Sequence, residues 1–349
     1  MMNSRERVLT AFDHRETEIV PRWCGASDEF WLKAKNELNL DDEGLRHRFG
    51  DDFRRVYTRY CGPELNLSKG ASWKSPFGIE RNGIGYGQPL THPMSEVCTI
   101  EEVEDYPWPD SQWMDPMGIR SDTEKWEGEF AILGGDWSPF WHDVIDLLGH
   151  ENLYYKMYDY PDVVKRIFEK VTDYYIEVSR NIFDEAADVI DIFFIGNDLG
   201  GQTGPLLSLD MYLEFIHPSI RRFIDLGHSY DLKVMMHCCG GYRPFIPSLI
   251  KAGMDGLHAL QPDAGGMDPA ALKKDFGKDI VLNGAIDSHY ILINGESPEF
   301  VRDKTIELLK IMAPGGGYIA GASHDTILEE TPVENVLAMF DAIGEFRNY

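Results

Sequence analysis

The sequence KVMMHCCG at residues 233–240 decides the fold, because a short strand-like run leads directly into His237, Cys238 and Cys239. Four further apolar runs in the second half of the chain also end on polar residues. These runs are 189–195 before Asn197 and Asp198, 254–260 before Gln261, 279–284 before Asp287, and 317–322 before Ser323, His324 and Asp325. Helix-forming sequence separates most of the runs, and parallel strands in such a chain end at one rim. The pattern therefore predicts an active site at that rim.

The alternation of strands and helices predicts an α/β fold, a single (β/α)8 TIM barrel domain over residues 1–349 with an N-terminal helical and hairpin elaboration. Residues 19–24 are expected to form the first strand, and residues 27–60 to be mostly helical. The segment 72–100 is rich in glycine and aromatic residues, which indicates a hairpin or irregular insertion. A doubly wound open sheet is the alternative, because periodicity alone does not show that a sheet closes.

Two kinds of signal place the helices. Apolar residues between positions 163 and 182 recur on one helical face, which predicts a long amphipathic helix. Asn3, Asp268, Ser297 and Thr331 each precede helix-forming sequence and are expected to cap it.

The charge of the chain limits its partners. With 59 acidic against 33 basic residues, the formal net charge is −26, which argues against nucleic acid and anionic membranes because both are bound by clustered Lys and Arg. No apolar stretch approaches the ~20 residues of a membrane span, and the N-terminus shows no signal-peptide core. The five cysteines form no disulfide pattern. A reducing cytoplasm is the expected location.

His237 and Cys239 are the first candidate metal ligands. They lie two residues apart on an expected strand, so their side chains point the same way, and in a barrel that direction is inward at the rim. Cys238 then points toward the helices and is expected to be a small buried residue. The alternative is that His237 is a hydrogen-bonded core histidine and Cys239 a packing residue.

Four further polar residues at strand ends are candidate catalytic groups. Asp198 is placed to orient a ligand, bind a metal or transfer a proton, and Asp287 is a second carboxylate of this kind. His324 is a candidate third metal ligand or proton donor, and Asp325 follows it in the same loop. For the three carboxylates the alternative is a helix or turn cap, and for His324 it is a solvated side chain.

Substrate-binding residues are expected around this group. Gln261 follows a strand and is placed to donate a hydrogen bond to a substrate, unless it is a surface amide. Residues 135–142 are dense in aromatic side chains, so Trp137 and Phe140 are expected to form a pocket wall, with packing beneath a loop as the alternative. The three glycines at 315–317 precede a strand and therefore do not form a nucleotide loop.

Motifs spread over nearly the whole chain resemble one superfamily. They are RERVL at residues 5–9, Pro21-Arg22, GGQTGPL at 200–206, HCCG at 237–240, NGAID at 283–287 and ILEETPVEN at 327–335. Together these motifs resemble the uroporphyrinogen decarboxylase superfamily. That group includes the porphyrinogen decarboxylases and the corrinoid-dependent (methylcobamide) methyltransferases, both of which are TIM barrels. By this resemblance Gln202 is expected to bind substrate.

The decarboxylase branch carries an Arg-Gln-Ala-Gly-Arg-like segment after its first strand, and that segment binds a substrate with many carboxylates. Here the corresponding stretch keeps one arginine, Arg22, and places Asp28 and Glu29 near the position of the second. Repulsion by these acids disfavours a polyanionic substrate. Arg22 is retained as a substrate-binding candidate, and porphyrinogen decarboxylation is not expected.

The methyltransferase branch binds zinc through His-x-Cys at a strand end and a later cysteine. His237 and Cys239 match the first two positions, but no cysteine follows residue 239. The resemblance therefore leaves the third ligand to Asp198, or to His324 or Asp325 in the last strand's loop. Zinc accepts nitrogen and oxygen ligands as well as sulfur.

The resemblance implies a methyltransferase that moves a methyl group between a corrinoid protein and a small donor or acceptor. With zinc the acceptor is a thiol, whose pKa the metal lowers. Without zinc, a reduced folate or a methoxylated donor is expected, and Asp198, Asp287 and His324 then transfer protons and orient the substrate. The alternatives are a lyase that decarboxylates a small acid and a non-catalytic protein that binds corrinoid or tetrapyrrole. A homodimer is the default assembly.

Overall fold

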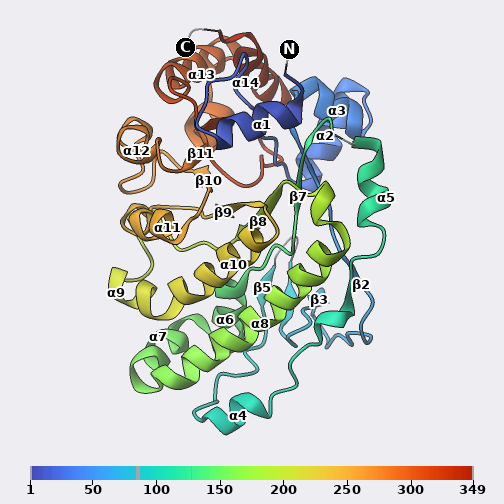
Figure 1. Cartoon of the computed structure of the whole chain (residues 1–349), viewed down its shortest axis with the longest axis vertical. Helices are drawn as coiled ribbons and strands as arrows, with labels where there is room; N and C mark the ends of the chain where they lie inside the picture. The colour runs from blue at the N-terminus through green and yellow to red at the C-terminus, as the bar shows by residue number, and fades with distance from the viewer. Residues whose placement is uncertain (1, 84–86, 127, 348–349) are drawn as a thin grey trace.

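A curled sheet of seven parallel strands forms the centre of the computed structural model, which describes residues 2–83, 87–126 and 128–347 (Figure 1). Neighbouring strands pair in the order β1-β7-β8-β9-β10-β11-β12, which follows the chain. The strands are β1 (Phe53–Arg55), β7 (Ala131–Gly134), β8 (Ile192–Gly196), β9 (Lys233–His237), β10 (Gly256–Leu260), β11 (Val281–Ile286) and β12 (Tyr318–Ala322). The five strands expected in the second half of the chain are confirmed, with slightly different ends.

Residues 21–23 occupy the eighth position, between β12 and β1. Arg22 forms a parallel bridge with Ala320, whose N–H donates to Pro21 O at 2.8 Å. On the other side, the N–H of Asp52 donates to Arg22 O at 3.0 Å. These bonds join both edges of the sheet, so the fold is the expected TIM-barrel-like fold and not an open sheet.

The first strand is shorter than the sequence predicts, and a neighbouring strand was not expected. The N–H of Arg22 donates to the side chain of Asp52 at 2.8 Å, so a carboxylate replaces a ladder carbonyl and residues 19–24 make only a bridge. The expectation that residues 27–60 are mostly helical is wrong at β1, because Phe53, Arg54 and Arg55 form a strand there. Two arginines in three residues hide the apolar pattern of a buried strand.

Helices surround the sheet (Figure 1). They are α1 (Ser4–Phe12), α2 (Asp28–Leu38), α3 (Asp42–Phe49), α4 (Ile100–Glu104), α5 (Ile119–Thr123), α6 (Phe140–Leu148), α7 (His150–Asp159), α8 (Pro161–Ala186), α9 (Leu209–Met211), α10 (His217–Ser229), α11 (Ile246–Ala252), α12 (Pro269–Phe276), α13 (Pro298–Met312) and α14 (Val333–Glu345). Asn3, Asp268 and Ser297 cap their helices as expected. Thr331 does not, because α14 begins one residue later than expected, after Pro332. No helix in the described parts of the chain has the length and apolar character needed to cross a bilayer.

The expected insertion is a small antiparallel sheet. Its strands are β3 (Trp73–Lys74), β4 (Glu80–Asn82) and β5 (Gln88–Pro89), and a separate pair joins β2 (Arg59–Tyr60) to β6 (Met114–Asp115). Residues 84–86 of this glycine-rich segment lie outside the described residues. Arg81 of β4 is buried and pairs with Asp143 at 3.1 Å and Asp146 at 2.6 Å, which fixes the small sheet against α6.

The interior of the barrel is apolar toward the N-terminal ends of the strands and polar at the rim formed by their C-terminal ends. Side chains that alternate along the strands fill the interior together with Val8, Ala11 and Phe12 of α1. Because α1 contacts residues next to the strand starts, such as Glu129 through Arg5 N, it closes the N-terminal end of the barrel. The opposite rim is where the strand ends meet.

Candidate functional site

Three neighbouring strands bring polar side chains together at the C-terminal rim. Asp198 follows β8, His237 ends β9, and His258 lies within β10. His237 is register-paired with Gly196 on one side and with His258 on the other. Met235 faces the barrel interior, so His237, two residues later, points inward as the sequence predicts.

Asp198, His237 and Cys239 form a compact group of three potential ligands. His237 Nε2 lies 3.3 Å from Asp198 Oδ1 and 3.3 Å from Cys239 Sγ. All three ligand atoms lie within 4.8 Å of one another. The N–H of Cys239 donates to Asp198 Oδ1 at 2.7 Å, which fixes the carboxylate against β9. Cys238 is fully buried, and its sulfur accepts from the N–H of Leu199 at 3.3 Å.

The chemistry of this donor set suits zinc. Imidazole nitrogen, thiolate sulfur and carboxylate oxygen are its usual ligands, and bonds of about 2.0–2.3 Å in a tetrahedron place neighbouring ligand atoms roughly 3.3–3.6 Å apart. The two separations measured from His237 Nε2 lie at the short end of that range. Three protein ligands leave a fourth position for water or substrate, as catalytic zinc sites do. These residues therefore fit a zinc ion.

The second nitrogen of His237 faces another histidine. His237 Nδ1 lies 3.1 Å from His258 Nδ1, and the His258 ring is fully buried. If Nε2 of His237 is a ligand, its Nδ1 carries the proton and donates it to His258 Nδ1. Such an outer hydrogen bond fixes the tautomer and the orientation of a metal-binding imidazole. His258 was not expected to belong to the site.

The two histidines have opposite pKa shifts. Burial lowers the pKa of His258 well below its usual value, and the nearby charge of His237 acts in the same direction. Burial also opposes the charged form of His237, but Asp325, Cys239 and Asp198 outweigh it and raise the pKa of His237 well above its usual value. The groups around His237 thus favour positive charge beside it, from a proton or from a bound cation, while the neutral form of His258 is favoured.

Asp198 has a further partner that the sequence did not suggest. His142 of α6 places Nε2 3.5 Å from Asp198 Oδ2. Burial opposes ionisation of Asp198, but hydrogen bonds from His142 and His237 outweigh it and hold the pKa of this carboxyl far below its ordinary range. Asp198 is therefore ionised, as a metal ligand must be.

A second group of potential ligands shares His237. It consists of His237, His258 and Asp325, with His258 Nδ1 4.0 Å from Asp325 Oδ1. The same His258 atom faces His237, so a metal in this group would displace the hydrogen bond between the histidines. His324 belongs to neither group of ligands found among residues 2–83, 87–126 and 128–347. It is exposed, and its Nδ1 accepts from the N–H of Thr326 at 3.2 Å.

Gln261 and Gln202 are close together beside the cluster. Gln261 Oε1 accepts from the N–H of Gly240 at 3.1 Å, and its Nε2 donates to Gln202 Oε1 at 2.9 Å. Gln202 Nε2 in turn donates to Asp263 at 2.9 Å. This chain of amides joins the loops after β8, β9 and β10. Their substrate-binding role stays a prediction.

A cavity of about 200 Å³ lies at the rim beside this amide chain, and several candidate residues line it. Gln261, Asp287 and His324 all line it. Asp287 accepts from the N–H groups of His289 at 2.8 Å and Tyr290 at 2.6 Å, so it caps the turn that follows β11. The catalytic roles of Asp287 and His324 stay predictions.

The aromatic candidates take different places. The ring of Trp137 lies 5.6 Å from that of His237, and a Cβ built on Gly196 would fall 1.8 Å from the Trp137 ring, so only glycine fits at Gly196. Phe140 is fully buried and stacks on Phe223 of α10 at 5.5 Å, so its ring packs between helices.

Arg22 is also not brought to the cluster. Its guanidinium lies against Gly50 at the end of α3, and one of its nitrogens is 3.0 Å from a Cβ built on Gly344 of α14. Burial lowers the pKa of Arg22, partly offset by Asp52. The side chain therefore occupies a packed position between helices.

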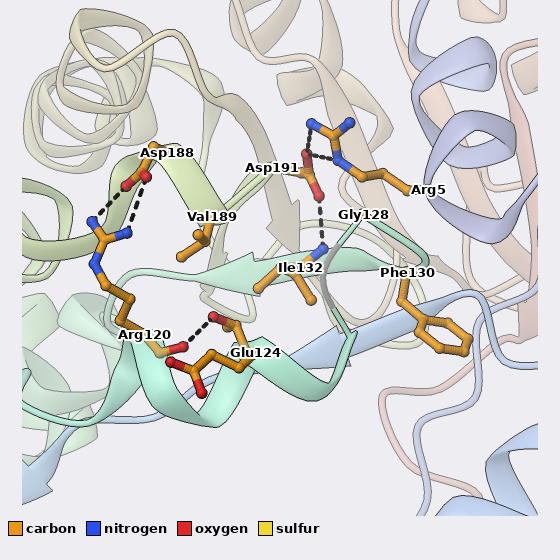
Figure 2. A pocket seen from close by; sticks show the side chains of 10 residues that line it. Arg5, Arg120, Glu124, Gly128, Phe130, Ile132, Asp188, Val189 and Asp191 are labelled. Atoms are coloured by element: carbon orange, nitrogen blue, oxygen red, sulfur yellow. Dashed lines mark hydrogen bonds and ion pairs between the residues drawn. The ribbon is translucent and has the colours of Figure 1, made fainter.

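A larger cavity, of about 760 Å³, lies at the opposite end of the barrel. Figure 2 shows that Arg5 of α1 pairs there with Asp191, which precedes β8, and that Arg120 pairs with Asp188. The N–H of Ile132 also donates to Asp191, at 2.9 Å. Arg5 and Arg120 are thus each paired with a carboxylate at this end of the barrel.

Three rim residues were missed by sequence reasoning: His142, His258 and Arg55. His258 lies within the apolar run of residues 254–260. If the two runs are aligned from their first residues, His258 falls beside His237 on the neighbouring strand, so the pair could have been proposed from the sequence. His142 ends the aromatic stretch, but nothing in the sequence links it to Asp198. Arg55 belongs to the strand that was not expected.

Comparisons with known proteins agree with the fold and the motifs. Residues 94–346 match the model of the family described as uroporphyrinogen decarboxylase (URO-D). A uroporphyrinogen decarboxylase from Solibacter usitatus is 29% identical over 193 residues, which are 55% of this chain and 51% of that protein. The chain thus matches about half the length of that relative. A solved structure, a methyltransferase from Methanosarcina mazei, shares the fold with a TM-score of 0.72 over 99% of both chains, at 18% sequence identity.

Proposed function

The chain belongs to the uroporphyrinogen decarboxylase family, and from this premise and the ligand group at the rim we propose that it is a methyltransferase. It transfers a methyl group from a methylated corrinoid protein to a small thiol. The observation that carries the proposal is the group Asp198, His237 and Cys239, whose ligand atoms lie within 4.8 Å of one another at the open end of the barrel.

These three residues would hold a zinc ion. When bound, zinc lowers the pKa of an incoming thiol so that sulfur is a nucleophile at neutral pH. His258 orients His237 through the 3.1 Å contact between their Nδ1 atoms, and His142 orients Asp198 from α6. Trp137 covers the His237 ring on one side and excludes water from it.

The transfer itself exchanges one bond for another. A bond forms between the thiol sulfur and the methyl carbon while the bond between carbon and cobalt breaks, and the electron pair of that bond stays on cobalt. The thiol proton leaves to solvent. Asp325, next to the histidines, and His324, Asp287 and Gln261 in the 200 Å³ cavity are the side chains available to orient the substrate or accept a proton.

The rim must also receive the corrinoid protein, so the partner's docking surface surrounds the cluster. A homodimer and a single domain over residues 1–349 are part of the same proposal. The placement of Arg22 between helices supports a small substrate over a porphyrinogen, since no paired arginines from that segment reach the rim.

The proposal is tested with methylcobalamin in place of the corrinoid protein. Zinc-loaded wild-type protein, the Asp198→Ala variant and the matched Asp188→Ala variant at the opposite end of the barrel are incubated with 2-mercaptoethanol. Thioether is measured by mass spectrometry and loss of the cobalt–carbon bond by absorbance. We expect turnover with wild type and Asp188→Ala, and a large loss with Asp198→Ala. No thioether from any thiol, or decarboxylation of a small acid instead, contradicts the proposal.

A further inference from the structure

Arg55, the last residue of β1, carries a guanidinium group at the rim with aromatic rings around it. Its Cζ lies 4.9 Å from the ring centre of Trp137, 5.0 Å from Tyr57 and 5.3 Å from Phe194. Contacts of a cation with ring faces are attractive, but they do not neutralise the charge. Arg55 therefore carries a positive charge among aromatic side chains.

The neighbouring arginines are paired with carboxylates, whereas Arg55 is not. Arg46 pairs with Asp51 at 2.8 Å, and Arg54 pairs with Glu43. Within the described residues, no carboxylate oxygen lies within 4.0 Å of the Arg55 guanidinium. With 59 acidic and 33 basic residues, an arginine in this chain has acids in excess to pair with. The missing partner therefore indicates that the charge has another use.

Arg55 opens into a cavity that shares Asp325 with the second ligand group. This cavity of about 170 Å³ is lined by Arg55, Tyr57, Trp23 and Asp325 among others. Asp325 also belongs to the second ligand group, with His237 and His258. The volume is below the roughly 300–1,000 Å³ of pockets that hold drug-sized ligands, so the molecule that enters it is small.

The aromatic side chains around Arg55 link it to both histidines. Trp137 lies 5.6 Å from His237, and Phe194 lies 5.4 Å from His258, measured between ring centres. A single ring thus separates the guanidinium from each histidine. Asp325, which lines the Arg55 cavity and also belongs to the second ligand group, connects this cavity with the two histidines.

We propose that Arg55 binds the carboxylate of the small substrate, whose reacting atom lies at the Asp198, His237 and Cys239 group. This inference names the substrate class of the proposed methyl transfer. It rests on that function for the thiol end of the substrate, and the binding of the carboxylate end is independent of it. The planar guanidinium matches a carboxylate with two parallel hydrogen bonds. A net charge of −26 repels anions at a distance, so a local cation is what an anionic substrate needs here.

The surrounding carboxylates favour a single negative charge on the substrate. Asp325 lines the same cavity, and Asp136, which is half-buried and accepts from Ser138 N at 2.9 Å, lies near Arg55. Arg46 and Arg54 also line the cavity, but each is already paired with a carboxylate. A phosphate with two charges would therefore be repelled by Asp325 and Asp136 more strongly than a carboxylate. A cationic substrate would be repelled by Arg55 itself.

The test is a binding measurement by calorimetry on the full chain. The ligands are 3-mercaptopropionate, neutral 2-mercaptoethanol, propionate and inorganic phosphate. Each ligand is titrated into wild-type protein and into the Arg55→Gln, Arg55→Lys and Arg59→Gln variants. Arg59 is the matched control, because its side chain is 74% exposed on β2. Thermal unfolding of each variant checks the fold, and Arg55→Lys keeps the charge if Arg55→Gln is unstable.

We expect 3-mercaptopropionate to bind wild type and Arg59→Gln about tenfold or more tighter than 2-mercaptoethanol, as a charge-assisted hydrogen bond allows. Arg55→Gln loses this preference, Arg55→Lys keeps part of it, and 2-mercaptoethanol is unaffected by either. Equal binding of the two thiols by wild type, no saturable binding of 3-mercaptopropionate, or tighter binding of phosphate than of propionate overturns the inference.

Propionate separates this inference from the proposed function. It has no thiol, so its dependence on Arg55 is measurable in protein treated with a chelator and requires no methyl transfer. Propionate binding that depends on Arg55 without any thioether formation leaves the carboxylate site standing and removes the methyltransferase. If thioether forms at the same rate in wild type and Arg55→Gln, and propionate binding does not depend on Arg55, the methyltransferase stands and the carboxylate site is removed.

Discussion

His237 and His258 sit opposite each other on neighbouring strands, with their Nδ1 atoms 3.1 Å apart in the barrel interior. This contact leaves Nε2 of His237 facing Asp198 and Cys239. One histidine is thus placed as a ligand and the other as the residue that orients it.

The first prediction concerns this orienting role. His258→Leu removes the acceptor for His237, and we expect zinc affinity to fall by about 10–100-fold, the usual effect of losing an outer hydrogen bond. His258→Asn places an oxygen where Nδ1 was, so it should restore most of the affinity. Competition titration with a chromophoric chelator measures both. Equal affinities for the two variants would show that the contact does not orient His237.

The second prediction identifies the third ligand. Asp198→Asn keeps the shape and the acceptor for Cys239 N but removes the charge, and we expect a loss of zinc affinity greater than that of His258→Leu. His324→Gln should leave zinc affinity unchanged, because His324 belongs to neither ligand group. The melting temperature of Asp198→Asn should fall, because the ionised carboxylate is paired with His142 and His237, so cooperative unfolding is the check that the variant is folded. A larger loss with His324→Gln would reverse the assignment.

The third prediction concerns the packing of Trp137. Gly196→Ala introduces a Cβ 1.8 Å from the Trp137 ring, which must move. We expect a destabilisation of about 1–3 kcal/mol, typical of overpacking, and a shift in tryptophan emission. Gly201→Ala is the control, because its Cβ would meet the end of a Leu206 side chain at 3.3 Å and the Gly204 carbonyl oxygen at 3.5 Å, without a severe clash. Urea denaturation with fluorescence detection compares the two, and equal stabilities would contradict the account of Gly196.

The fourth prediction is a dependence of stability on pH. Burial raises the pKa of Asp143 to about 6, although Tyr175 and Arg81 lower it and Asp146 raises it further. The folded state therefore holds the proton more tightly than the unfolded chain, whose value is 3.8. The resulting stabilisation is complete below the unfolded pKa and is lost as the pH rises through 6.

Asp143→Asn removes this titration, since asparagine resembles the protonated acid. The free energy of unfolding of wild type, relative to Asp143→Asn, should fall by about 3 kcal/mol at most between pH 4 and pH 7. Urea titrations at several pH values measure the difference. A wild-type curve that is parallel to that of Asp143→Asn, or that rises with pH relative to it, would contradict the raised pKa.

The barrel was predictable from the sequence because its later strands are almost wholly apolar and end on polar residues. The apolar runs at residues 189–195 and 317–322 indicate strands whose two faces are both buried. The amphipathic pattern of α8 is equally clear. β1 could not be predicted in this way, because Arg54 is buried through its pairing with Glu43, and this pairing depends on the tertiary structure.

The candidate site was predictable only in part. His237 and Cys239 follow from spacing on one strand, and Asp198 from its place after another. His142 and Arg55 reach the rim from elements whose relative positions the sequence does not reveal. Phe140 and Arg22 show the opposite case, since each lies beside a strand end in sequence but points into helix packing.

The most direct test of the account is the metal content of the untagged protein after zinc is supplied, measured by mass spectrometry beside His237→Ala and Cys239→Ser. The account predicts about one zinc per wild-type chain, with the metal lost in both variants while their thermal unfolding stays cooperative. A wild type without zinc, or a full complement of zinc retained by both variants, would contradict the metal site on Asp198, His237 and Cys239.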